Sequence, residues 1–304
     1  MKPHHPTDTL PEGRASVPRL SSGRAALFAL LAALIGSGCR TTATDGGAPA
    51  TPEIVYFAQI TDTHHGPGIH QWRFDRAVDG INAAPFPISC VFHTGDFANN
   101  NLHEEEVAQA ITNHLFRLRP RVLAVPGNHD ITKHNAPEAV RSFERHIGPL
   151  ATSFETNGVV FVALYTEPLR GGLPPLGVDY DPIAWLRATL RETHGKPVVV
   201  ATHTPACDDF YEGTVHPGWP DEAREAWIDA LAEGNVVAVI CGHFHRNEVH
   251  WDRRGVPTYV APSIAGFWGR QASYRIYGLD PATGRLSYRT AYIEDPAPGS
   301  SPIR

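Results

Sequence analysis

Five short apolar segments, each followed directly by His, Asp or Asn residues, constrain the fold of this chain more than any other feature. Runs of roughly four to eight residues rich in Val, Ile, Leu and Phe are typical of strands buried on both faces. The segments with their polar ends are EIVYFAQITDTHH (53–65), ISCVFHTGDF (88–97), RVLAVPGNHD (121–130), PVVVATHTPA (197–206) and NVVAVICGHFH (235–245).

Amphipathic patterns typical of helices lie between these segments. The alternation of strand and helix patterns predicts an α/β core. In open α/β sheets, binding sites form beyond the carboxyl ends of the strands, and all five polar clusters fall at that end. The predicted helices lie in RFDRAVDGINAA (73–84), HEEEVAQAITNHLFRL (103–118), DPIAWLRATLRETHG (181–195) and DEAREAWIDALAEG (221–234).

The pattern changes after residue 247 to strand, turn and strand, without helices. The sequence DPATG (280–284) predicts a hairpin turn within this region. We expect these strands to complete a sheet of the same domain, because no internal repeat or second domain is apparent.

The first 52 residues are not typical of a folded domain. Three Arg residues precede the apolar run AALFALLAALIG (25–36), and SGC follows, ending at Cys39. This order is typical of an export signal, and the run is shorter than the about 20 residues that a membrane span needs. The end of the signal resembles a bacterial lipoprotein processing site, with Gly36 as a departure from its usual larger aliphatic residue. A plain secretory signal or a helical anchor are the alternatives.

The resulting domain plan is a signal peptide over residues 1–38, a flexible linker over 39–52, one domain over 53–295 and a loose tail over 296–304. We expect an exported protein in the periplasm or cell envelope, lipid-anchored at Cys39. The net charge of −6 gives no general attraction to nucleic acid or to an anionic membrane, so the anchor would be the only membrane contact. The sequence leaves the oligomeric state open.

Three cysteines remain after Cys39, and none has C-x-x-C spacing, so a cysteine zinc site is not expected. In an oxidising compartment one disulfide can form. We expect Cys90 in the core, and a bridge between Cys207 and Cys241.

The polar clusters together offer two carboxylates, one amide and four imidazoles. Nitrogen and oxygen ligands of this kind suit zinc, iron and manganese. Seven are too many for one tetrahedral ion and suit two ions about 3.5–4 Å apart with one bridging carboxylate. The seven are Asp62, His64, Asp96, Asn128, His203, His243 and His245, with His129 left over.

The ordered motifs D-x-H, GD, GNHD, a single H and GHxH resemble the calcineurin-like metallophosphoesterase family over roughly residues 54–250. Within it, TGDFANN, PGNHD and GHFHRN resemble the class III cyclic-nucleotide phosphodiesterase branch. The resemblance implies a four-layer α-β-β-α sandwich with two mixed sheets and a metal site at the carboxyl ends of the strands.

The resemblance also implies roles for the residues. Asp96 would bridge two ions, each iron, manganese or zinc. His129 would be no ligand but a general acid or charge stabiliser at the leaving oxygen, oriented by Asp130. The first ion would be held by Asp62, His64 and His245, and the second by Asn128, His203 and His243.

The implied reaction is hydrolysis of a phosphodiester in a small molecule by in-line attack of a metal-bridging hydroxide. The alternatives are a phosphomonoesterase for nucleotides or sugar phosphates, and a lipoprotein that binds phosphate without catalysis. Gly95 and Gly127 would let the backbone turn tightly beside the metals.

Departures from the family's patterns exclude some of its branches. Purple acid phosphatases have a Tyr three residues after the bridging Asp, where this chain has Asn99. Protein Ser/Thr phosphatases continue with a DRG stretch, which GDFANNNLHEEE lacks. The sequence has no cluster of Lys and Arg residues, so it predicts no surface for binding a nucleic-acid duplex.

Two loops with aromatic residues are expected to set the substrate. They are TPACDDFYEGTVHPGWP (204–220) and SIAGFWGRQ (263–271). Trp268 or Tyr211 would stack on a nucleobase; alternatively, Trp268 and Trp219 are core or lid residues.

Overall fold

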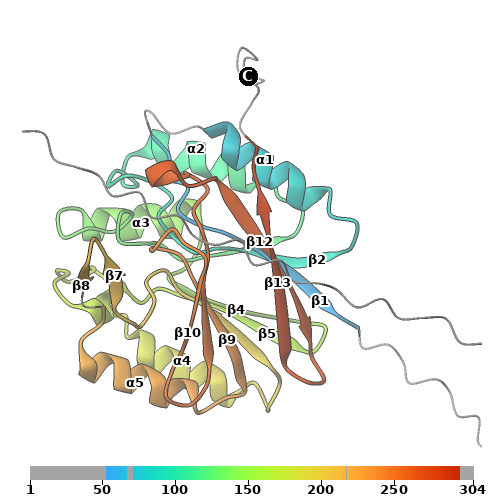
Figure 1. The fold of residues 1–304 in the computed structure, drawn as a ribbon. Coiled ribbons are helices and arrows are strands. Elements are labelled where there is room, and N and C mark those ends of the chain that lie inside the picture. Colours follow the sequence, from blue (N-terminus) through green and yellow to red (C-terminus); the bar gives the residue numbers. More distant parts are fainter. Residues whose placement is uncertain (1–52, 67–70, 217, 295–304) are drawn as a thin grey trace, which may run out of the picture. The chain divides into compact units, whose positions relative to one another are not determined.

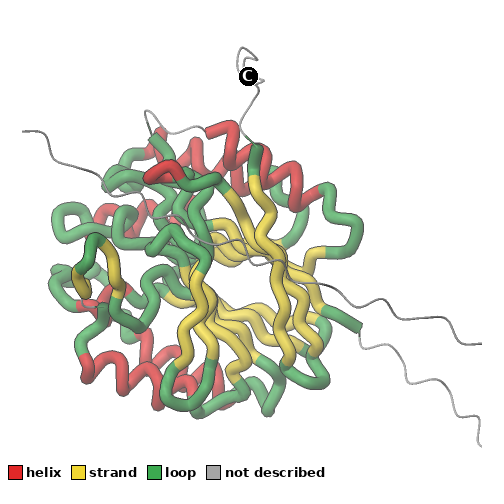
Figure 2. The backbone as a smooth tube through the Cα atoms, in the orientation of Figure 1, coloured by secondary structure: helices red, strands yellow, loops and turns green. Residues whose placement is uncertain are grey.

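The computed structural model describes residues 53–66, 71–216 and 218–294, and two large mixed sheets make up its centre (Figure 1, Figure 2). The predicted signal peptide, Cys39, the linker and the tail from residue 296 lie outside the described residues. Within those ranges, no helix combines the length and the apolar character that crossing a membrane requires.

The first sheet has the order β13-β12-β1-β2-β3. Its strands β1, β2 and β3 are parallel, β12 pairs with β1 in antiparallel register, and the edge strand β13 pairs with β12 in antiparallel register. The C-terminal strands therefore complete a sheet, as predicted, and Asp280 and Thr283 close the hairpin turn between them. The strands are β1 (Val55–Ile60), β2 (Ile88–His93), β3 (Arg121–Ala124), β12 (Ser273–Asp280) and β13 (Arg285–Tyr292).

The second sheet has the order β10-β11-β9-β6-β5-β4. Strands β11, β9, β6 and β5 run parallel, and β10 and β4 close the two edges in antiparallel register. The strands are β4 (Ala151–Thr156), β5 (Val159–Leu164), β6 (Val198–Ala201), β9 (Val236–Cys241), β10 (Glu248–Trp251) and β11 (Pro257–Val260).

Helices cover the outer face of each sheet, so that the described domain has four layers (Figure 1). Three hydrophobic clusters separate these layers, one under each helix layer and one between the sheets. This arrangement confirms the predicted α-β-β-α sandwich. The first sheet is covered by α1 (Gln71–Asn82), α2 (Glu105–Leu115) and α3 (Ala136–His146), and the second by α4 (Pro182–Arg191) and α5 (Asp221–Leu231).

Several elements were not predicted. Strand β5 is as apolar as the five predicted strands and fully buried, but Tyr165 and Thr166 follow it instead of a polar cluster. A pattern that pairs strands with polar ends therefore misses it. Helix α3, strand β4 and the small hairpin of β7 (Asp209–Tyr211) and β8 (Thr214–His216) were also not predicted.

The layer between the sheets is built on aromatic contacts. The ring of Phe161 lies 5.2 Å from that of Phe57 and 5.9 Å from that of Phe92, and Phe57 stacks on Tyr277 at 4.8 Å. All four side chains are fully buried. The two sheets are therefore joined through a close-packed aromatic core.

Replacing Phe161 by Ala removes the ring through which β5 of the second sheet contacts Phe57 and Phe92 of the first sheet. We expect the free energy of unfolding to fall by about 3–5 kcal/mol, because a cavity remains where the ring was. Urea unfolding followed by circular dichroism measures the change. The matched control is Trp251→Ala, whose ring is 68% exposed; it should change stability by less than about 0.5 kcal/mol. A loss below about 1 kcal/mol in Phe161→Ala would contradict this view of the core.

Candidate dinuclear metal centre

All seven predicted ligands lie at the carboxyl ends of strands from both sheets. The loops after β1, β2 and β3 come from the first sheet, and those after β6 and β9 from the second. The site therefore lies along the edge at which the two sheets meet. The contributions are Asp62 and His64 after β1, Asp96 after β2, Asn128 after β3, His203 after β6, and His243 and His245 after β9.

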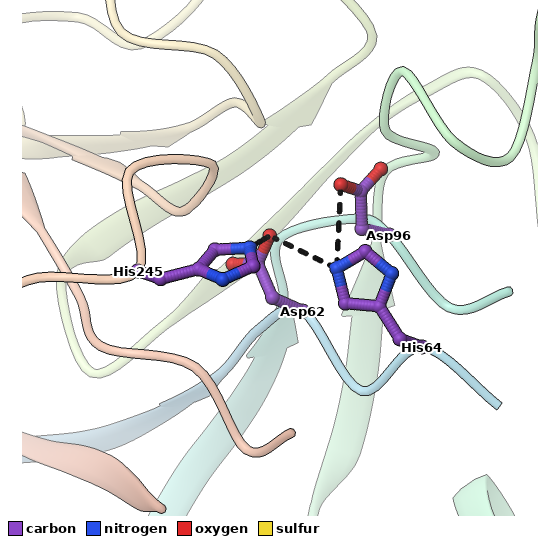
Figure 3. A group of neighbouring side chains, drawn as sticks. All are labelled: Asp62, His64, Asp96 and His245. Carbon is purple, nitrogen blue, oxygen red and sulfur yellow. Dashed lines mark ion pairs between the residues drawn. The ribbon is translucent and has the colours of Figure 1, made fainter. Parts of the chain in front are cut away.

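Four side chains converge in the first cluster, and Figure 3 shows how they point toward one another. The closest pair is His245 Nε2 and Asp62 Oδ1, at 2.9 Å. His64 Nε2 lies 3.7 Å from Asp96 Oδ2 and 4.0 Å from Asp62 Oδ1. One ligand atom of each residue lies within 4.8 Å of the others, which is a spacing that a single ion can bridge.

A second cluster shares Asp96 with the first. Asp96, His203 and His243 also have ligand atoms within 4.8 Å of one another. His203 Nε2 lies 3.2 Å from Asp96 Oδ2 and 3.1 Å from Asn128 Oδ1. One carboxylate between two sets of ligands is the arrangement expected for a two-ion site.

The hydrogen bonds of two imidazoles favour metal binding. His203 Nδ1 lies 2.7 Å from the Thr94 carbonyl oxygen, and His64 Nδ1 lies 2.8 Å from Asn99 Oδ1. Since both oxygens only accept, each Nδ1 donates, and in the neutral imidazole each Nε2 carries the lone pair that can bind an ion. His64 Nε2 is buried and has no hydrogen-bond partner among the described residues. Such an orphaned acceptor fits a ligand atom for a metal.

Most of the candidate ligands have a backbone conformation that ordinary residues avoid. The left-handed region is unfavourable for residues with a Cβ, by roughly 1–3 kcal/mol each. Backbone hydrogen bonds hold these turns, among them Asp62 N to Gly95 O at 2.9 Å and His64 N to Asp96 O at 2.9 Å. Five ligands have positive φ: Asp62 (53°), His64 (46°), Asp96 (53°), His243 (68°) and His245 (54°).

The ionisable groups of the site shift one another's pKa values. Burial raises the pKa of Asp62, but the nearby His245 and His203 outweigh it and hold that pKa well below its usual range. Burial lowers the pKa of His203, but Asp96 outweighs this effect and raises it to about 10. Burial, with the charge of His203, lowers the pKa of His243 to about 3. A positive charge is therefore favoured beside Asp96, as a metal-binding site requires.

Two glycines allow the ligand loops to approach each other closely. A Cβ on Gly127 would lie 2.2 Å from Asp96 Oδ1, and a Cβ on Gly95 would lie 2.6 Å from His203 Nδ1. Gly95 also has a φ of +93°. No larger residue fits at either position without moving a ligand.

The prediction that Asp130 orients the His129 ring is wrong in the described structure. The fully buried Asp130 carboxylate accepts hydrogen bonds from the backbone N–H groups of Phe97 (3.1 Å), Ala98 (2.9 Å) and Gly127 (2.8 Å). It therefore joins the loops after β2 and β3. His129 Nδ1 has no hydrogen-bond partner among the described residues. The backbone N–H of His129 donates to Asp96 Oδ1 at 2.8 Å.

The predicted bridge between Cys207 and Cys241 is absent, since all three described cysteines are free. Cys241 is buried at the end of β9, and its sulfur lies 3.1 Å from the Thr202 hydroxyl. That contact satisfies the thiol within the second sheet. Cys90 lies in the core, as predicted.

Sequence reasoning missed the groups that surround Asn128. A cavity of about 420 Å³ adjoins this residue, and Lys133 and Arg170 lie in its lining. Arg170 Nη1 donates to the buried Glu167 carboxylate at 3.0 Å, and the Thr204 hydroxyl donates to the same carboxylate at 2.5 Å. Arg170 follows strand β5, which was not predicted, so no motif placed it near the ligands.

Comparison with known proteins identifies the family. Residues 55–247 match the model of the family described as calcineurin-like phosphoesterase. The chain belongs to this family. Its membership confirms the resemblance and the fold expected from it, while the class III branch stays a prediction.

Among curated proteins, the serine/threonine-protein phosphatase CPPED1 of Bos taurus is 32% identical over 140 residues, which are 42% of each chain. The Homo sapiens protein of that name is 32% identical over 145 residues, 43% of each chain. The match therefore spans less than half the length of these relatives.

Solved structures support the same fold. A dimetal phosphatase from Danio rerio has a TM-score of 0.50 at 15% identity, covering 78% of this chain and 98% of its own. GAP50, described as the anchor in the inner membrane complex of Plasmodium, has a TM-score of 0.56 at 12% identity, covering 80% and 90%.

Asp96→Asn removes the one carboxylate shared by the two clusters. We expect this variant to lose ions from both positions, whereas His243→Ala loses ions mainly from the second. Metal analysis after gel filtration should give about two ions per chain in the unaltered protein, about one in His243→Ala and fewer in Asp96→Asn. Equal metal content in the two variants would contradict the shared role.

Asn99→Ala removes the acceptor that fixes the His64 ring. We expect metal affinity to fall roughly 10–100-fold, the usual effect of losing a group that orients a metal-binding imidazole. Titration with Mn²⁺ measures the change. Asn113→Ala, on the exposed side of α2, is the matched control and should bind as the unaltered protein does. An unchanged affinity in Asn99→Ala would show that this hydrogen bond does not prepare the ligand.

Proposed function

We propose that the protein is a two-metal phosphoesterase that hydrolyses phosphodiester bonds. The observation that carries the proposal is the pair of ligand clusters that share the Asp96 carboxylate. We assign the first ion to Asp62, His64 and His245 and the second to Asn128, His203 and His243. When bound, two such ions lower the pKa of a bound water to make a nucleophile and neutralise charge on phosphoryl oxygens.

The charge of the ligand set supports a phosphate substrate. Asp62 and Asp96 are its only formal anions, and Asn128 contributes a neutral amide oxygen. Two divalent ions held by two carboxylates leave a formal surplus of positive charge. Burial strengthens the attraction between this surplus and a phosphate anion, because the local dielectric is low.

His129 is our candidate for the proton donor to the leaving oxygen. Its backbone is fixed by the hydrogen bond to Asp96, and its ring lies 5.2 Å from that of His64. The side chain is only partly buried, so its ring can meet a substrate that enters from solvent. A positioned imidazole typically contributes roughly 10²–10⁴-fold to such a step.

The cavity beside Asn128 supports a diester. Arg170 is held at its lining by Glu167, and Lys133 adds a second positive charge. A diester retains a second substituent on phosphorus, and a cavity of about 420 Å³ next to a metal ligand can receive it. Because Glu167 also lines the cavity and pairs with Arg170, Lys133 supplies the net positive charge, which suits a polar or anionic substituent.

A phosphomonoesterase is the second candidate. It is favoured by the curated relatives, which are named as serine/threonine-protein phosphatases. Against a protein phosphatase stands the segment after Asp96, which lacks the DRG stretch of that branch. A phosphate-binding protein without catalysis is less favoured, because the ligands and His129 are all present.

Hydrolysis of bis-p-nitrophenyl phosphate and p-nitrophenyl phosphate by the Mn²⁺-loaded protein tests the proposal. We expect a higher kcat/KM for the diester. In Asn128→Ala it should fall by more than the roughly 10–100-fold loss typical of outer-shell changes. Faster cleavage of the monoester would instead support the phosphatase. If two ions are bound and neither ester is cleaved, the proposed activity is wrong for these substrates.

A further inference from the structure

The segment after β11 packs directly on the first ligand cluster. It contains the short 3-10 helix η2 (Phe267–Gly269). The Phe267 ring stacks on the His245 ring, with centroids 5.4 Å apart and planes at 18°, and meets the edge of the His64 ring at 4.9 Å. This segment is therefore part of the wall of the candidate metal centre.

Backbone hydrogen bonds fasten the same segment to the ligand loops. Ile264 N donates to Thr61 O at 3.0 Å, and Ala265 N donates to Asp62 O at 3.1 Å. From its other end, the Arg270 guanidinium donates to the carbonyl oxygen of His245 at 3.1 Å. The segment thus has a fixed position relative to the ligands.

Trp268 stands out from this fixed segment into solvent. Its side chain is 74% exposed, and its ring lies 5.0 Å from that of His245. Its backbone is left-handed, with φ 55° and ψ 36°, which is a genuine outlier for a bulky residue. The fold thus keeps a large apolar ring at the rim of the site at two costs, in backbone strain and in exposed apolar area.

Arg270 adds a positive charge to this ring. Its Cζ atom lies 5.5 Å from the Trp268 ring centroid, within the range of a cation–π contact. Since its hydrogen bonds to the ligand loop fix the guanidinium, it also limits the positions that the Trp268 ring can take. An exposed, oriented indole beside a phosphate-binding site is suited to stacking on a flat ring.

The other aromatic candidates fit this role less well. Tyr211 is already stacked on His216, with centroids 3.5 Å apart and planes at 10°. Trp219 is buried in the core against Trp227, so the expected core role holds for it. Trp251 is exposed on β10, a strand that supplies no ligand.

We propose that Trp268 forms a binding subsite for a flat heteroaromatic substituent of the substrate, such as a nucleobase, on the His245 side of the metal centre. The inference rests on the proposed function, because it assigns the stacked ring to an ester cleaved at that centre. Stacking on one aromatic side chain contributes enough to raise the affinity for such a ligand about 10-fold or more.

Calorimetric binding of AMP and of ribose 5-phosphate to the full-length, Mn²⁺-loaded protein tests the subsite. The two probes share a sugar phosphate, and only AMP has a base. We expect the unaltered protein to bind AMP about 10-fold more tightly. Trp268→Ala should bind both probes equally, with the affinity for ribose 5-phosphate unchanged. Trp268→Phe should keep part of the preference, and the control Trp251→Ala should keep all of it.

The outcomes separate this inference from the proposed function. A preference for AMP that survives in Trp268→Ala overturns the subsite, as does an unaltered protein that cleaves esters but binds both probes equally. If Trp268→Ala instead loses binding to vesicles and keeps the preference, the ring serves a membrane surface and the subsite is overturned. A protein that shows the Trp268-dependent preference but cleaves no ester supports the subsite and contradicts only the proposed activity.

Discussion

The structure depends on a buried carboxylate, that of Asp96, at the edge where the two sheets meet. Burying an ionised carboxylate without a partner is strongly unfavourable. Here the partners come from both sides of the sandwich. His203, at the end of β6 in the second sheet, lies 3.2 Å from the carboxylate, while the His129 N–H, after β3 in the first sheet, donates to it at 2.8 Å. The site therefore joins the two sheets at one edge, and Phe57 and Phe161 join them in the interior.

The ligand loops along this edge contain strained backbone, since five of the seven candidate ligands have positive φ. These five residues keep a left-handed backbone only because the surrounding contacts and hydrogen bonds fix it. Asp130 is central to this support, since its carboxylate accepts three backbone N–H groups from two ligand loops. Its burial and the charge of Asp96 raise its pKa to about 7. Asp130 thus acts on the ligand positions through the backbone, and any effect on His129 passes through that loop.

The candidate ligands could be predicted from the sequence because each lies directly after an apolar strand. Strand ends are visible as sharp changes from apolar to polar residues, so Asp62, Asp96 and His203 were found without knowledge of the fold. Contacts between segments distant in the sequence were not predictable in this way. The acceptor for His64 is Asn99, 35 residues away, and Phe267 reaches His245 from 22 residues away. The role that the family resemblance implied for Asp130 failed because three backbone N–H groups from the loops after β2 and β3 occupy its carboxylate instead.

The two flanks of the site bear on the kind of ester that fits. Trp268 lies beside His245 of the first cluster, whereas the cavity with Arg170 adjoins Asn128 of the second. A phosphomonoester has a single substituent and could use only one of these features. A diester has two, and it could place a flat ring against the indole while a polar or anionic group enters the cavity. The proposed preference for a diester with two unlike substituents rests on this difference between the flanks, an exposed indole on one side and a polar cavity on the other.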